Sequence, residues 1–173
     1  MTAENSEPSA AGETKALNAA LAAEHAAVWG YGVVGAALPL AGRAPAYAAE
    51  QAHRDLRDRL TALLTSRRVD PVAAEAAYAL PFPVLSAVDA ATLAVTLEDG
   101  TSRAWTWVLD QATERSTREL AVTALTGAEQ RAVGWRAAAA TSHGTACLDQ
   151  SGARAALLGS IAAGLRGQEA RLA

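Results

Sequence analysis

The sequence predicts an all-α protein folded as a four-helix bundle. Alanine makes up more than a quarter of the 173 residues, leucine is scattered among it, and aromatic residues supply only 5%. This composition, with β-branched residues confined to short patches, favours helix over sheet. Caps and prolines divide the chain into four long helical segments, joined by two short connections and one long, proline-rich one.

The first helix is expected over residues 14–38, where Pro39 and the turn around Gly42 end it. The second, over residues 45–68, opens with Pro45, which suits the first turn of a helix. A connection at residues 69–85 follows. It contains Pro71, Pro81 and Pro83, and one short helix is expected inside it at residues 73–78.

Capping pairs mark the starts of the next two helices. Ser86 and Asp89 open a helix expected over residues 86–112, and Ser116 and Glu119 open one over residues 116–140. A weaker fifth helix is expected at residues 152–172. Two antiparallel pairs joined by one long crossover is the connectivity of ferritin-like bundles. We therefore expect a disordered tail at residues 1–13, the bundle at 14–140, and a C-terminal loop and helix at 141–173.

Composition excludes several classes of protein. The net charge of -3 and the lack of any sizeable Lys/Arg cluster argue against nucleic-acid binding. The single cysteine, Cys147, excludes an internal disulfide framework. The longest uncharged run, residues 26–42, contains four glycines and Pro39 and is shorter than the roughly 20 residues of a membrane span. No secretory leader is evident, so we expect a cytoplasmic protein.

Helical periodicity places a few polar side chains on the apolar faces. Glu24 falls among Leu17, Leu21 and Tyr31, and Glu98 shares a face with Trp105. On the second helix, His53 lies in line with the buried leucines and Glu50 lies about 60° from that line. Buried carboxylates are costly unless a cation, a hydrogen-bond donor or a metal compensates them, so this cluster is the candidate functional site.

Two interpretations of the cluster compete. Glu with Glu-x-x-His is a ligand set of di-iron bundles, so Glu24, Glu50, His53 and Glu98 could bind iron or manganese. Alternatively, arginines such as Arg54, Arg57 or Arg131 could compensate the carboxylates in a polar network without metal.

Several blocks of sequence resemble a ferritin-like domain family of unassigned function found in actinobacteria. The first block spans Leu21 to Gly32 and contains Glu24, His25, Trp29 and Tyr31. Later blocks are His53-Arg54, Arg57-Asp58, Tyr78-x-Leu80-Pro81-x-Pro83-Val84, Leu93-x-x-x-Leu97-Glu98 and Ala132 to Arg136. The resemblance implies the bundle and makes a metal or redox role conceivable, without assigning an activity.

The sequence departs from the complete di-iron pattern. The inward face of the fourth helix has no second Glu-x-x-His and instead carries mostly alanine, at Ala121, Ala124, Ala128 and Ala132. Counting back from the first turn places Arg57 near the level of Glu24 and His53 near that of Tyr31, which predicts a Glu24–Arg57 pair and a His53–Tyr31 contact. The expected network comprises Glu24, Tyr31, His53, Arg54, Arg57, Asp58 and Glu98.

The function predicted from these features is a non-enzymatic bundle with a degenerate di-iron-type site. A metal-binding redox or storage-related protein and a small-ligand carrier are the alternatives. A homodimer is also expected, because Trp29 and Val33 lie off the main face of the first helix and Gly30, Gly32 and Gly35 would allow another helix to approach.

Overall fold

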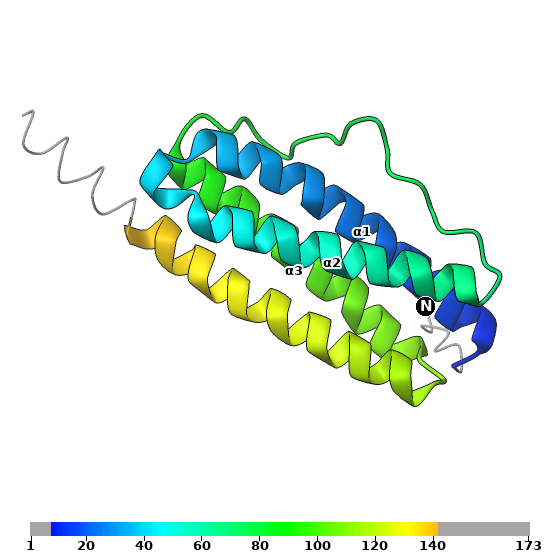
Figure 1. Cartoon of the computed structure of the whole chain (residues 1–173). Coiled ribbons are helices and arrows are strands. Elements are labelled where there is room, and N and C mark those ends of the chain that lie inside the picture. Colours follow the sequence, from blue (N-terminus) through cyan, green and yellow to red (C-terminus); the bar gives the residue numbers. More distant parts are fainter. Residues whose placement is uncertain (1–7, 142–173) are drawn as a thin grey trace, which may run out of the picture.

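The computed structural model describes residues 8–141, which form an all-α four-helix bundle, as the sequence predicts (Figure 1). Helix α1 spans Ala10–Ala37, α2 spans Ala44–Ser66 and α3 spans Ala87–Gln111. The fourth helix begins at residue 115 and continues to residue 141. A single 3-10 turn, η1 (Leu40–Gly42), lies between α1 and α2. The predicted C-terminal helix, together with His143 and Cys147, lies outside the described residues.

The connectivity is that of two antiparallel helix pairs. Helix α1 packs against both α2 and α3. The turn containing η1 reverses the chain between α1 and α2, and a turn at residues 112–114 does so between α3 and the fourth helix. Between the pairs, the crossover (residues 67–86) returns along the length of the bundle (Figure 1). The ferritin-like topology predicted from the loop lengths is therefore confirmed.

Caps explain where the helices begin. Ser9 accepts a hydrogen bond from the backbone N–H of Gly12, so α1 begins at Ala10 and residues 10–13 belong to the helix rather than to a disordered tail. Pro45 lies in the first turn of α2, and the Ser86 hydroxyl accepts from the N–H of Asp89, as expected for both starts. The prediction of the first helix was late by one turn because the Ser9 cap was overlooked.

The crossover contains no helix, so the short helix predicted at residues 73–78 is wrong. The segment must span the bundle from the end of α2 to the start of α3, and extended chain covers roughly 3.3 Å per residue, against 1.5 Å in a helix. Contacts with α1 fix its path. Asn18 accepts from the Val72 N–H at 2.8 Å, and His25 donates to the Val72 carbonyl at 3.2 Å. Further along, the rings of Trp29 and Tyr78 lie 5.8 Å apart.

The same contacts bear on the expected homodimer. Trp29 packs against Tyr78, a Cβ at Gly30 would meet Leu97 of α3, and a Cβ at Gly35 would lie 3.5 Å from Tyr47. Most of the second apolar side of α1 is therefore covered by the chain itself, and Gly32 alone among these glycines faces open space. The homodimer stays a prediction without support from this face.

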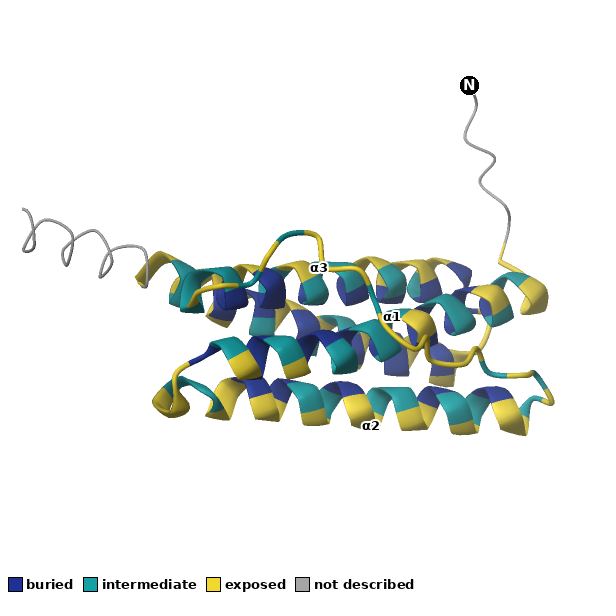
Figure 2. Ribbon diagram, turned by 90° about the horizontal axis from the view of Figure 1, so that it is seen from above, coloured by how far each residue is buried: buried dark blue, intermediate teal, exposed yellow. Residues whose placement is uncertain are grey.

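Two hydrophobic clusters make up the core, and Figure 2 shows their buried residues along the inward sides of the helices. One cluster surrounds Leu17, Leu21, Leu60 and Trp105, and the other surrounds Tyr31, Val34, Leu93 and Trp135. Between the two clusters along the bundle axis lie Glu24, His53 and Glu98, and none of the three has exposed surface. No helix in residues 8–141 combines the length and apolar character of a membrane span.

Candidate functional site

Each of the four helices contributes one charged side chain to the layer between the two hydrophobic clusters. Glu24 comes from α1, His53 from α2, Glu98 from α3 and Arg131 from the fourth helix. The first three have no exposed surface, and the Arg131 side chain is 22% exposed. We refer to these four residues as the interior quartet.

His53 lies between the two carboxylates. Its Nδ1 is 2.6 Å from Oε2 of Glu24, and its Nε2 is 3.2 Å from Oε1 of Glu98. The Tyr31 ring stacks against the imidazole, with centroids 5.3 Å apart and an interplanar angle of 25°. Both ring nitrogens therefore face carboxylate oxygens, and the ring orientation is fixed from three sides.

Glu98 accepts hydrogen bonds from three residues. The Tyr31 hydroxyl donates to Oε1 at 2.5 Å. Arg131 binds the carboxylate bidentately, with Nε 2.8 Å from Oε1 and Nη2 3.0 Å from Oε2. A bidentate guanidinium is among the strongest partners that a carboxylate has in proteins.

Glu24 has a different second partner. The indole Nε1–H of Trp105 donates to Oε1 at 2.7 Å, while Oε2 faces His53. Trp105 is itself fully buried, and its indole nitrogen needs an acceptor inside the core. Each oxygen of both buried carboxylates thus has a donor.

These contacts determine the protonation of the quartet. Burial by itself would lower the pKa of His53, but the hydrogen bonds and charges of Glu24 and Glu98 outweigh it and raise the pKa above 6.5. Burial would raise the pKa of Glu98, and His53 and Arg131 outweigh it and lower that pKa. Burial and the Glu98 carboxylate raise the pKa of Tyr31, which stays neutral. The quartet thus combines two acidic and two basic side chains.

The structure brings together four of the seven residues expected in the polar network: Glu24, Tyr31, His53 and Glu98. Arg54 instead forms an ion pair with Glu50, one turn away on the outer side of α2. Arg57 pairs with its neighbour Asp58 and not with Glu24, contrary to the level estimate. That estimate ignored rotation around α2: Arg57 lies about 40° from His53, away from the centre of the buried stripe.

Arg131 was one of three candidate arginines but was not included in the expected network, and Trp105 was not considered as a hydrogen-bond donor to it. Arg131 is near the edge of its helix face, and only the packing of the fourth helix against α3 brings it to Glu98. Trp105 was expected as a core aromatic, and it is one. The face that Trp105 shares with Glu98, seven residues earlier, placed its ring in the same interior but did not indicate that the indole N–H would bind Glu24.

A third buried carboxylate, Glu13, was missed because it fell in the supposed tail. It is 1% exposed, and it joins α1 to the end of α2 and the start of the fourth helix. Oε1 accepts from Arg67 at 2.7 Å and from Thr117 at 2.6 Å, and Oε2 accepts from the Thr113 N–H at 2.6 Å. Burial would raise the pKa of Glu13, but donors from Thr113, Thr117 and Arg67 lower it from 4.5 to about 2.

The arrangement of the quartet matters for metal binding. A first-row metal takes several N or O ligands that converge on one point. Here the two carboxylates lie on opposite nitrogens of one imidazole, and Glu50, the fourth predicted ligand, pairs with Arg54. Within residues 8–141, no three His, Cys, Asp or Glu side chains are grouped so that they could hold a metal ion.

Comparison with known proteins places the chain in a family. A crystal structure of a conserved hypothetical protein, rv2844, from Mycobacterium tuberculosis is 38% identical to it with a TM-score of 0.72. The alignment covers 74% of this chain and 97% of that one. Among curated proteins, none matches. The model of a family described as a domain of unknown function, DUF4439, matches residues 16–157. Because this match spans most of the chain, the protein belongs to the DUF4439 family.

Proposed function

We propose that this protein is a non-enzymatic four-helix bundle that binds other molecules at its surface. The interior quartet occupies the position that a di-iron-type centre has in related bundles. In this view the interior stabilises and aligns the four helices, and the function resides on the surface. The interior does not, in this view, bind a redox metal.

The observation that carries the proposal is the complete satisfaction of the interior polar atoms. Among residues 8–141, Ser102 Oγ is the one buried side-chain N or O atom without a hydrogen-bond partner, and it lies outside the quartet. An active site that binds a metal or a substrate usually keeps polar groups available for it. The quartet has none to offer.

Replacement of the quartet by a metal would require several costly changes. The cation would have to displace a proton from His53 and compete with the bidentate Arg131 for Glu98. It would also need a ligand from the fourth helix, whose inward face at this level is Ala128 and Ala132. These costs favour the network over iron or manganese.

Metal analysis tests the proposal. The untagged protein is purified from cells grown with added iron, manganese and zinc, and its metal content and melting temperature are measured with and without these ions. We expect less than about 0.1 equivalent of each metal and a melting temperature that the ions leave unchanged, since a ligand that binds the native state stabilises it. Close to one or two equivalents of iron or manganese, with metal-dependent stabilisation, would establish the redox alternative instead.

A further inference from the structure

The hydroxyl of Ser102, on the side of α3 near the fourth helix, has no hydrogen-bond partner among the described residues. Hydroxyls on the same helix, at Thr92, Thr96 and Thr106, each donate to the backbone carbonyl four residues earlier. Ser102 would use the carbonyl of Glu98 in this way, but the Thr101 hydroxyl donates to it. Ser102 is only 7% exposed, so its hydroxyl lacks both a protein partner and ready access to bulk water.

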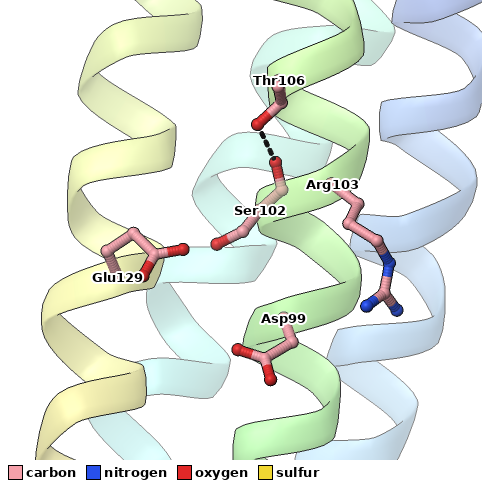
Figure 3. Close-up of a pocket in the computed structure, with 5 residues that line it drawn as sticks. All are labelled: Asp99, Ser102, Arg103, Thr106 and Glu129. Atoms are coloured by element: carbon pink, nitrogen blue, oxygen red, sulfur yellow. Dashed lines mark hydrogen bonds between the residues drawn. The ribbon is translucent and has the colours of Figure 1, made fainter.

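Ser102 lines an open surface cavity of about 360 Å³ formed by residues of α3 and the fourth helix. The other lining residues are Asp99, Arg103 and Thr106 from α3, and Glu129 from the fourth helix. In Figure 3 the Ser102 hydroxyl points from α3 toward Glu129, and the Arg103 side chain extends from the opposite edge of α3.

The charges around this cavity are only partly paired. Arg136 binds Oδ1 of Asp99 at 2.6 Å. Glu129 and Arg103 form no ion pair with any other residue of the described part of the chain, and both are exposed. The cavity therefore presents one carboxylate and one guanidinium without an ion-pair partner within residues 8–141, and the buried, unpartnered hydroxyl of Ser102 points toward the carboxylate.

We propose that this cavity binds a small zwitterion, a molecule of the amino-acid class. Its ammonium group would bind Glu129 and donate to the Ser102 oxygen, and its carboxylate would bind Arg103. The Arg103 guanidinium disfavours a metal cation, and the carboxylates of Asp99 and Glu129 disfavour phosphate, since like charges repel. The inference goes beyond the proposed function and does not depend on it, because the quartet and this cavity share no side chain.

A ligand series of graded length tests the assignment. Glycine, β-alanine, 4-aminobutyrate and 6-aminohexanoate carry the same two charges at increasing separation, and butylamine and butyrate each carry one of them. Binding to the full-length protein is measured by ligand-observed NMR and calorimetry at concentrations up to about 10 mM, which covers weak, millimolar affinities. We expect one length to bind best and both single-charge compounds to bind at least about tenfold more weakly.

Three variants locate the binding to the cavity. Ser102→Ala, Glu129→Gln and Arg103→Gln should each weaken binding of the best zwitterion by about tenfold, the usual effect of losing a hydrogen bond to a charged group. Glu119→Gln, on the same helix but outside the cavity, is the matched control and should leave affinity unchanged. Ser102→Ala removes an unsatisfied hydroxyl and places a better helix former, so it should remain folded.

The outcomes are separable from those of the metal experiment. Loss of binding in all three cavity variants, with unchanged metal content, supports the zwitterion site. No binding of any probe at about 10 mM, or equal binding by the parent and the three variants, overturns it. Tight binding of butylamine that Arg103→Gln leaves unchanged would reassign the cavity to simple amines and overturn the proposal too.

Discussion

Oε2 of Glu24 lies 2.6 Å from Nδ1 of His53, and neither side chain has any exposed surface. The pair links α1 to α2 at the level where the apolar core is interrupted. The other imidazole nitrogen faces Glu98 of α3, so a substitution of Glu24 or His53 alters contacts among three helices.

Replacement of Glu24 by Gln tests how much this pair contributes to the free energy of unfolding. The substitution keeps the shape but leaves the buried imidazolium with one carboxylate, and breaking a buried pair typically costs roughly 3 kcal/mol or more. We expect a loss of this size in the free energy of unfolding, measured by urea denaturation at pH 7. Glu50→Gln makes the same chemical change at the surface pair with Arg54 and should cost less than about 1 kcal/mol. Equal effects of the two variants would contradict the interior role of Glu24.

The raised pKa of His53 predicts a pH dependence of stability. Because the folded pKa lies above the unfolded value of 6.5, the contribution of His53 is complete below pH 6.5 and is lost as the pH rises through the folded value. The stability difference between the parent protein and His53→Gln should therefore shrink between pH 6 and pH 9, by at most about 1.4 kcal/mol per pH unit. Denaturation curves at pH 6, 7.5 and 9 measure it. A difference that grows with pH would show that His53 is neutral in the folded protein.

Glu13 predicts the opposite pH dependence. Its pKa falls from 4.5 to about 2 on folding, so its contribution is present above pH 4.5 and is lost as the pH falls toward 2. That shift corresponds to about 3 kcal/mol, and Glu13→Gln should cost up to this amount at pH 7 and clearly less at pH 3. Glu119→Gln, at an exposed ion pair of the fourth helix, provides the control with little effect at either pH. A cost for Glu13→Gln that is the same at both pH values would count against the ion cluster as its cause.

Local signals in the sequence were enough to predict most of the fold. Ser86, Pro45 and the spacing of apolar residues determine the starts of α2 and α3 and the inward positions of Glu24, His53 and Glu98, because caps and helical faces depend on neighbouring residues only. The crossover was recognised from its prolines, but its path along Asn18, His25 and Trp29 depends on the assembled bundle.

The partners of the site could be predicted less well, since a partner depends on how two helices are rotated and staggered. Arg57 and Arg131 were both candidates for the buried carboxylates, and helical periodicity alone could not choose between them. The choice follows from the packing of the fourth helix on α3, which takes Arg131 to Glu98, whereas Arg57 binds its neighbour Asp58 on α2. Ala128 and Ala132, close to Arg131 in the fourth helix, are buried and carry no polar group that could bind Glu98 in its place.

Tyr31→Phe isolates one donor of the network. The variant removes the hydroxyl that donates to Glu98 while keeping the ring that stacks on His53, so the cost should be about 1.5–3 kcal/mol, the range for a hydrogen bond to a charged group. Tyr47→Phe is the matched control, because Tyr47 is 55% exposed and should change stability by less than about 0.5 kcal/mol. Denaturant midpoints of both variants provide the comparison, and an effect of Tyr31→Phe no larger than that of Tyr47→Phe would exclude a contribution from this donor.

Two glycines of α1 separate helix propensity from packing. Alanine at Gly32 would meet nothing within 4 Å and should raise the free energy of unfolding by roughly 0.5–1 kcal/mol, because alanine is the better helix former. At Gly30 the new Cβ would lie 2.7 Å from Cδ1 of Leu97, so the leucine must move away from α1 and the gain should be cancelled or reversed by the roughly 1–3 kcal/mol of overpacking. Thermal melts of the two variants, and of Gly30→Ala combined with Leu97→Ala, measure the difference. The second substitution removes the clash, so the penalty of Gly30→Ala should be smaller in the Leu97→Ala background. If Gly30→Ala is instead as stabilising as Gly32→Ala, α1 and α3 do not approach each other closely at this level.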